Sequence, residues 1–288
     1  MSMRKKFPGS VVRANPVVPT EDSAPGIWTL EQQNQNQKKG TWPFVGDPNF
    51  KDTILLLHGD TSQQPSIEDK SSSNHEVTVA GDAKATNWNP FNLPEGYWST
   101  YFTGSNAYLS FPNSSAFAFG TGAFTIEFWF NGSLNNDKFI LSGRAAVTTL
   151  HITFGGYGGS TAGSLRYVGS STITTGSDLI SDNTWHHVAI ERDGSNNIVL
   201  YIDGVSKGTG TDTTNYTTTT GTWYLGANDV GQGNQPTGYF SNFRIVKGSN
   251  VYGGAFSSPS FPLTPVINTQ LLILQSNRFV DNSTNGIA

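Results

Sequence analysis

The chain has 288 residues, no cysteine and a formal net charge of -4; 13% of its residues are charged and 12% are aromatic. This composition excludes a chain that is disordered throughout, because disordered chains are poor in aromatic residues and rich in net charge. The lack of cysteine excludes disulfide scaffolds, thiol redox enzymes and cysteine-ligated metal centres. The small net charge argues against nucleic-acid binding. No apolar run approaches the ~18 residues of a membrane-spanning helix, so we expect no membrane insertion.

Residues 1–47 predict an extended arm, since prolines at positions 8, 16, 19 and 25 disfavour helix and sheet. The spacing of Thr29 and Gln32 is that of a capping box and predicts one short helix over 30–39. Leu30 is its one apolar side chain, so we predict that Trp28, Leu30 and Trp42 dock the arm on a partner. The basic residues at 4–6 precede no apolar stretch, which predicts synthesis in a cytoplasm without a secretory signal.

Residues 48–288 predict one β-domain. Phe124, Ile126, Phe128 and Phe130 alternate with other residues and predict a strand with one buried face. Strands at 185–192 and 198–202 are separated by an Asp-Gly turn, and a second Asp-Gly turn follows at 203–204. Further strands are predicted at 53–58, 76–80, 107–111, 149–154, 164–168, 222–226, 239–246 and 270–274. Many short strands without helical periodicity favour an all-β, antiparallel sandwich or barrel.

Two details of the β-domain lead to separate predictions. The stretch 208–221 is rich in Thr and Gly and predicts an exposed edge hairpin. The sequence of 53–58 is similar to that of 269–274, which predicts that these two strands lie close together and join the ends of the domain. The alternative is that both are leucine-rich by chance.

Five motifs follow one another across the segment 98–265: Tyr101–Leu109, Phe124–Trp129, Trp185–Ala189, Leu200–Gly204 and Phe243–Ile245. In their order and spacing, they resemble the laminin-G and concanavalin A-like jelly-roll family. This resemblance implies a two-sheet jelly roll after the arm. Gly26–Leu30, Trp42-Pro43 and the repeated leucine strand also resemble virion proteins of tailed phages, especially those of cyanobacteria. This second resemblance implies a structural subunit of a phage particle.

Enzymatic activity is not predicted. Some proteins of this fold are glycosidases, which need two carboxyl groups flanking the scissile bond. The strand at 124–130 offers Glu127 alone, which we interpret as an outer-face or hydrogen-bonded residue. His187 is expected in a structural role, and no Gly-x-Ser-x-Gly elbow is present. We therefore assign no catalytic residue.

Metal and sugar sites follow from the family resemblance. A rim calcium would find Asn228, Asp229 and Asn234 in one glycine-rich loop, with residues 135–137 as a second cluster. Calcium needs six to eight oxygen ligands. We therefore expect these residues to form turns rather than to bind calcium, and we predict no cofactor. Bound calcium is the alternative. His186 and His187 would point to opposite sheet faces and could not share an ion. Loop tyrosines are the candidates for glycan contact: Tyr157, Tyr216, Tyr239 and Tyr252. Trp185 and Trp223 are expected in the core.

The sequence thus predicts a phage virion structural protein, made in the host cytoplasm and forming a homo-oligomer within the particle. The arm would bind other virion proteins, and the jelly roll would be displayed as a tail-fibre or adhesion subunit, or as a capsid decoration protein that aids attachment to host glycans. The alternatives are a free lectin and a polysaccharide hydrolase or lyase.

Overall fold

The computed structural model describes residues 57–59, 67–69, 76–91, 98–133, 138–143, 150–155, 161–177, 180–181, 183–217, 221–228, 234–264, 266 and 269–274. The predicted arm with Trp28, Leu30 and Trp42 lies outside these residues, as do Tyr157, Asp229 and the cluster at 135–137. Within the described ranges, no helix has the length and apolar character needed to cross a membrane.

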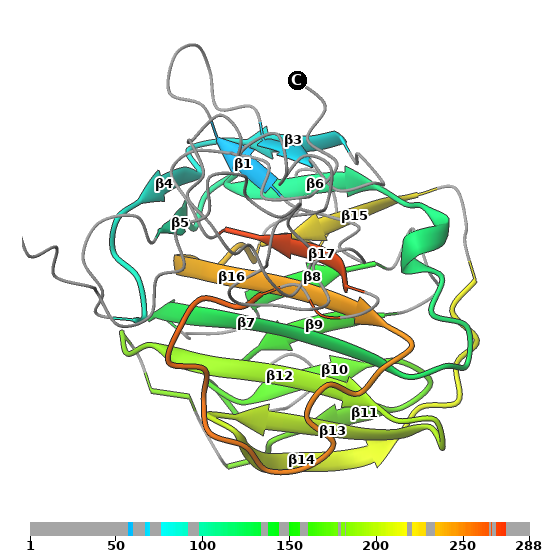
Figure 1. The fold of residues 1–288 in the computed structure, drawn as a ribbon. Helices are drawn as coiled ribbons and strands as arrows, with labels where there is room; N and C mark the ends of the chain where they lie inside the picture. Colours follow the sequence, from blue (N-terminus) through cyan, green and yellow to red (C-terminus); the bar gives the residue numbers. More distant parts are fainter. Residues whose placement is uncertain are drawn as a thin grey trace, which may run out of the picture.

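Two antiparallel sheets form the described body (Figure 1). One sheet has the order β1-β2-β3-β6-β15-β8-β9-β10-β11, with bounds Leu57–Gly59, Ile67–Asp69, Glu76–Ala80, Tyr108–Pro112, Thr222–Leu225, Lys138–Ser142, His151–Phe154, Leu165–Val168 and Thr172–Thr174. The other has the order β14-β13-β12-β7-β16-β5-β4, with bounds Val205–Thr211, Asn197–Ile202, His186–Arg192, Phe124–Ser133, Thr237–Lys247, Ser99–Thr103 and Lys84–Thr86. Strand β17 (Thr269–Ile273) pairs with β16, and a 3-10 helix spans Ser115–Phe117. The predicted antiparallel jelly-roll sandwich is confirmed.

Each strand predicted from the sequence overlaps a strand of the structure. The strands that the sequence did not predict include β4 and β11, which have three residues each. Their sequences lack the alternation of apolar residues on which strand prediction depends.

The core lies between the sheets and is built largely from aromatic rings. Phe124, Ile126, Phe128 and Phe130 of β7 are all buried there, as their alternation predicted. The other face of β7 is also buried: Thr125 accepts a hydrogen bond from the backbone N–H of Val251 at 2.9 Å. The segment that follows β16 therefore covers the outer face of this sheet. Polar residues on that face are buried beneath the segment.

The predicted edge hairpin within 208–221 is wrong in part. An edge strand is present, but β14 pairs with β13 rather than with a strand inside this stretch. Residues 212–217 leave the sheet, and Asp212 and Tyr216 are fully buried. Because these two side chains have partners in the interior, the stretch turns inward instead of forming an exposed ribbon.

The two similar leucine-rich segments do approach each other. Strands β1 and β17 have Cα atoms within 8 Å of one another. They do not pair, since β1 pairs with β2 and β17 pairs with β16, in different sheets. The prediction that they lie close together is confirmed for the described parts of the two segments.

Candidate functional site

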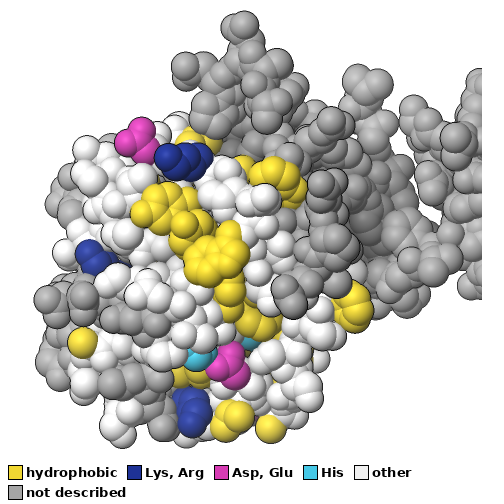
Figure 2. Space-filling model, turned by 90° about the vertical axis from the view of Figure 1, so that its left-hand side faces the viewer, with side chains coloured by type: hydrophobic (Ala, Val, Ile, Leu, Met, Phe, Trp, Pro, Cys, Tyr) yellow, Lys and Arg dark blue, Asp and Glu magenta, His cyan; other side chains and the backbone are white. Residues whose placement is uncertain are grey.

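An exposed cluster of aromatic rings lies on one side of the molecule. We call Trp88, Tyr101, Trp185 and Tyr239 the aromatic cluster. The ring of Trp88 is 4.5 Å from that of Tyr239 and 5.5 Å from that of Trp185, centroid to centroid. Tyr101 and Tyr239 are 4.7 Å apart. Trp88 remains 46% exposed, and Figure 2 shows hydrophobic side chains in a band on the side where β4 and β5 lie in Figure 1.

The pleat of the sheet explains this cluster. Phe102 and Phe240 face the core, so their neighbours Tyr101 and Tyr239 face outward, since successive side chains of a strand alternate. Tyr101 and Tyr239 are direct cross-strand partners. The backbone of Trp88 is held in place because its carbonyl accepts a hydrogen bond from Ser99 Oγ at 2.5 Å. The cluster is therefore a fixed surface rather than a set of independent side chains.

Of the predicted glycan-contacting tyrosines that the structure describes, Tyr216, Tyr239 and Tyr252, only Tyr239 belongs to this cluster. Tyr252 stacks on Phe256 at 3.6 Å, and its hydroxyl donates to Glu127 at 2.6 Å. Tyr216 is fully buried and offers no surface to a sugar. The prediction for Trp185 was wrong, because this residue is half-buried within the cluster, whereas Trp223 is in the core as predicted.

Sequence reasoning missed Trp88 and Tyr101. A signal for Tyr101 was present, because it adjoins Phe102 in a strand with one buried face. Trp88 lies between two asparagines and before a proline. A tryptophan within such turn residues has no strand in which to be buried, and that context was the available signal.

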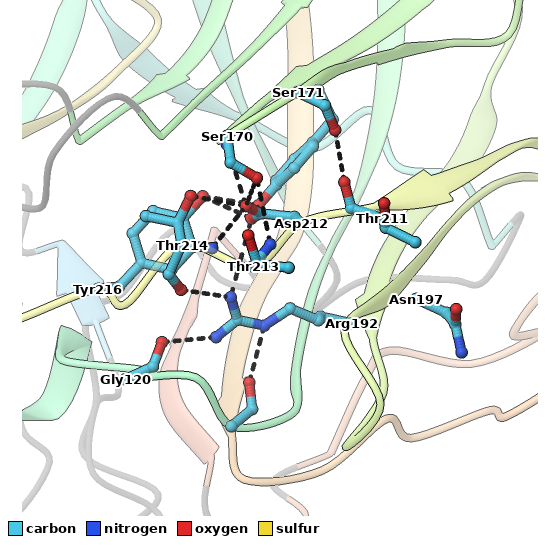
Figure 3. Close-up of polar contacts among 12 residues, drawn as sticks. Gly120, Ser170, Ser171, Arg192, Asn197, Thr211, Asp212, Thr213, Thr214 and Tyr216 are labelled. Carbon is cyan, nitrogen blue, oxygen red and sulfur yellow. Dashed lines mark hydrogen bonds and ion pairs between the residues drawn. The ribbon is translucent and has the colours of Figure 1, made fainter.

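Tyr216 belongs to a polar network around Asp212 (Figure 3). Asp212 Oδ2 accepts hydrogen bonds from the hydroxyls of Tyr216, at 2.7 Å, and Tyr167. Asp212 Oδ1 accepts from Thr214 Oγ1 at 2.6 Å and from Ser170 Oγ at 2.8 Å. Burial would raise the pKa of Asp212, but these hydrogen bonds hold it well below its usual range. The network ties the segment after β14 to the end of β10.

Arg192 completes this interior network. Its guanidinium donates to the carbonyl oxygens of Gly120, Gly122 and Thr214 at 2.7–2.9 Å, and Nη1 is 3.8 Å from Asp212 Oδ2. With its charge satisfied in this way, Arg192 can be fully buried. Asp212 and Arg192 both hold loops in place, and both side chains are buried away from the surface.

A second interior network surrounds Glu127. Its Oε1 is 2.7 Å from Nη2 of Arg244, and its Oε2 is 3.1 Å from Nε2 of His187. Burial would raise the pKa of Glu127, but Arg244, His187 and Tyr252 lower it to about 2. The interpretation of Glu127 as a hydrogen-bonded, outer-face residue is confirmed, and His187 is buried and hydrogen-bonded to it.

A second carboxylate lies close to Glu127, which the sequence analysis did not foresee. In the register of β7 and β12, Glu191 is opposite Thr125, two residues from Glu127 on the same face. Burial raises the pKa of Glu191, and the charge of Glu127 adds to this effect. Glu191 accepts hydrogen bonds from the backbone N–H groups of Tyr252 and Gly253 at 2.7 and 3.0 Å. The segment 249–256 thus covers both carboxylates.

Ser181, His186 and Asp203 form a hydrogen-bonded chain near the start of β12. Ser181 Oγ is 2.7 Å from His186 Nε2, and His186 Nδ1 is 2.6 Å from Asp203 Oδ2. This is the atom order of a Ser-His-Asp triad. The Asp203 side chain is 43% exposed, however, whereas the triad aspartate is buried. Asp203 Oδ1 also accepts a hydrogen bond from the backbone N–H of His187 at 2.9 Å. These hydrogen bonds therefore hold β12 against the turn after β13.

The predicted calcium loop is described in part. Asn228 and Asn234 lie in the described ranges, and Asp229 lies outside them. No group of three or more His, Cys, Asp or Glu side chains with metal-binding geometry occurs in the described part of the chain. His186 and His187 contact Asp203 and Glu127 respectively, on opposite faces of the sheet.

Comparisons with known proteins agree with this fold. Residues 102–249 match a sequence family described as the concanavalin A-like lectin/glucanases superfamily. No curated protein matches the sequence. Among solved structures, the binding domain of Paraclostridial Mosquitocidal Protein 1 is 16% identical over 73% of this chain and 51% of its own, with a TM-score of 0.51. The chain therefore spans about half the length of that binding domain.

A second structure is similar over almost all of its own length. Domain 4 of AbnA, a GH43 extracellular arabinanase from Geobacillus stearothermophilus, was solved in complex with arabinotriose. It is 15% identical over 68% of this chain and 93% of its own, with a TM-score of 0.50. At such low identity, both likenesses concern the fold.

Proposed function

Because this chain belongs to the concanavalin A-like lectin/glucanases superfamily, we propose that it binds glycans without cleaving them, as the displayed module of a tailed-phage particle. The binding surface is the aromatic cluster. The N-terminal arm docks the module on other virion proteins, and the attachment of the particle to a host-surface glycan is the biological outcome.

The observation that carries the proposal is the exposure of Trp88 above Tyr239 and Trp185. Tyr and Trp combine an apolar ring with a polar group, which suits a partner that is apolar on one face and hydroxylated at its edge. A sugar ring is such a partner. The arabinotriose bound to domain 4 of AbnA, which shares this fold, supports the choice of a saccharide.

Binding without cleavage is supported by the state of the candidate catalytic groups. Glu127 is engaged on both oxygens by Arg244, His187 and Tyr252, and Glu191 is covered by the backbone of Tyr252 and Gly253. A glycosidase needs one carboxyl group able to protonate the leaving oxygen and a second that reaches the sugar. We expect no release of reducing sugars from any polysaccharide, and no labelling of Ser181 by a fluorophosphonate.

The experiment that tests glycan binding compares two variants on a glycan array. Trp88→Ala removes the most exposed ring of the aromatic cluster and is expected to lower binding at least about tenfold with little change in melting temperature. Phe261→Ala removes another exposed aromatic ring, 64% exposed, and is the matched control that should bind as wild type does. Wild-type protein that binds no glycan, or a Trp88→Ala variant that binds normally, would refute the proposal.

The virion role is supported by the resemblance of the arm region and the repeated leucine strand to phage virion proteins. The alternative is a free lectin, which would be a monomer in solution and would remain so at high concentration. We expect a homo-oligomer in light scattering of the purified chain, and incorporation into particles when it is co-expressed with virion proteins.

A further inference from the structure

The aromatic cluster is part of a row that crosses the sheet. Lys84 of β4 is opposite Tyr101 of β5, Tyr101 is opposite Tyr239 of β16, and Tyr239 is opposite Asn131 of β7. On β12, His186 is opposite Phe130, so Trp185 continues the row beside Asn131. Directly opposed residues share one face of a sheet. The row is thus continuous over five adjacent segments, from Lys84 to Trp185.

The row faces away from the core. Phe102, Phe130 and Phe240, the neighbours of three row members, are all buried between the sheets. Lys84 is exposed at one end of the row, and Tyr101, Tyr239 and Trp185 are each partly exposed. Adjacent strands are about 4.8 Å apart, so four strand intervals extend over roughly 19 Å. This length exceeds what a single sugar ring can cover.

The chemistry of the row changes along its length. Tyr101, Tyr239 and Trp185 offer apolar rings, and the last two are 6.4 Å apart, with the Asn131 position between them. At the β4 end, the Lys84 ammonium offers donors for hydroxyl or carboxylate oxygens. The Asn131 side chain is buried, so the row offers a ligand three rings and, at one end, the Lys84 ammonium. These groups match a ligand that repeats an apolar face and carries hydroxyl groups.

We propose that this row binds an internal stretch of a linear polysaccharide, which lies across the strands from β4 towards β12 rather than entering a pocket with one terminal sugar. The inference rests on the proposed glycan-binding function and adds the class of ligand. Successive sugars contact the exposed or partly exposed members of the row, Lys84, Tyr101, Tyr239 and Trp185. Affinity therefore increases with the length of the oligosaccharide.

The test uses glycans that bind wild-type protein on the array, each supplied as its mono-, di-, tri- and hexasaccharide. Titration calorimetry is expected to show the hexasaccharide binding at least about tenfold more tightly than the disaccharide. Tyr101→Ala and Trp185→Ala, at two separate positions in the row, should each reduce this gain with length. Tyr101→Phe retains the ring and should keep most of it.

A matched control comes from the opposite sheet. Tyr108 packs against Tyr224 at 5.9 Å, as Tyr101 packs against Tyr239, but it lies on β6. Tyr108→Ala should leave the dependence on length unchanged, and circular dichroism would show that each variant is folded. A monosaccharide that binds as tightly as the hexasaccharide would overturn this inference and leave the proposed function intact. Failure of every glycan to bind would overturn both.

Discussion

At the scale of single residues, Glu127 shows how a buried charge is stabilised in this protein. It lies on the outer face of a sheet, yet it is as buried as the core phenylalanines. A buried carboxylate is tolerated only when it is paired and hydrogen-bonded. Arg244, His187 and Tyr252 meet this need, and Arg244 also donates to the carbonyl of Thr264, beyond the covering segment 249–256.

We predict that Glu127→Gln destabilises the fold by about 3–5 kcal/mol, because it leaves the guanidinium of Arg244 buried without its counter-charge. Urea unfolding followed by tryptophan fluorescence measures this loss. Glycan binding at a temperature where the variant is folded should be unchanged, since Glu127 lies outside the aromatic cluster. Loss of a polysaccharide-cleaving activity in this variant would contradict the non-catalytic assignment.

The same residue predicts how stability depends on pH. The pKa of Glu127 is lowered to about 2 in the folded protein, against about 4.3 in an unfolded chain. Its contribution to stability is therefore complete above about pH 4.3 and is lost as the pH falls to about 2. Glu191, whose pKa is raised, acts in the opposite sense, since its contribution is lost as the pH rises through the folded value.

We expect the free energy of unfolding of wild-type protein to fall steeply between pH 4.3 and pH 2, and that of Glu127→Gln to fall less steeply. The slope of one coupled proton is about 1.4 kcal/mol per pH unit. Urea titrations at several pH values give both slopes. Equal slopes for wild type and Glu127→Gln would show that the partners of Glu127 do not lower its pKa in the folded protein.

At the scale of elements, the turn between β13 and β14 connects two parts of the fold. Asp203 and Gly204 have φ values of 52° and 77°, as the central residues of a type I′ hairpin require. The backbone N–H of Phe256 donates to the carbonyl of Gly204 at 3.0 Å. A Cβ atom on Gly204 would lie 1.9 Å from the carbonyl oxygen of Phe256. The glycine thus allows both the hairpin and the close approach of the covering segment.

Gly204→Ala is predicted to destabilise the protein by about 2 kcal/mol or more, through positive φ and the clash with Phe256. Gly194→Ala is the matched control, since a Cβ atom on Gly194 meets nothing within 4 Å and its φ is not in the left-handed region. That change should stay within about 0.5 kcal/mol of wild type. Thermal unfolding of the two variants makes the comparison, and similar melting temperatures would contradict the role of the turn.

At the scale of the whole molecule, the two sheets form one body. Its first and last described strands, β1 and β17, lie close to each other. The arm was predicted from sequence to lack a core of its own, and it lies outside the described residues. If the arm has no core of its own, the body is expected to fold and bind without it, and the arm to dock on a partner.

Removal of residues 1–47, or alanine at both Trp28 and Trp42, is predicted to leave the melting temperature nearly unchanged and to abolish assembly. Each tryptophan that fills a pocket on a partner would contribute about 3–5 kcal/mol to that interface. Calorimetry and co-sedimentation with particles provide the two measurements. A melting temperature many degrees lower, with assembly retained by the folded fraction, would show that the tryptophans pack on their own body.

The sequence by itself determined the sandwich, because alternation in β7, β12 and β13 reports which face of each strand is buried and the Asp-Gly turns report where the chain reverses. It also indicated that Glu127 is an outer-face or hydrogen-bonded residue, as the contacts with Arg244, His187 and Tyr252 show. Only the tertiary structure decided which tyrosine is exposed: Tyr216 and Tyr239 read alike in the sequence, yet the first bonds to Asp212 in the interior and the second lies under Trp88 at the surface. The proximity of Glu191 to Glu127 and the row from Lys84 to Trp185 bring together strands that are separated along the chain. Such neighbours are set by strand order and register, which local periodicity does not encode.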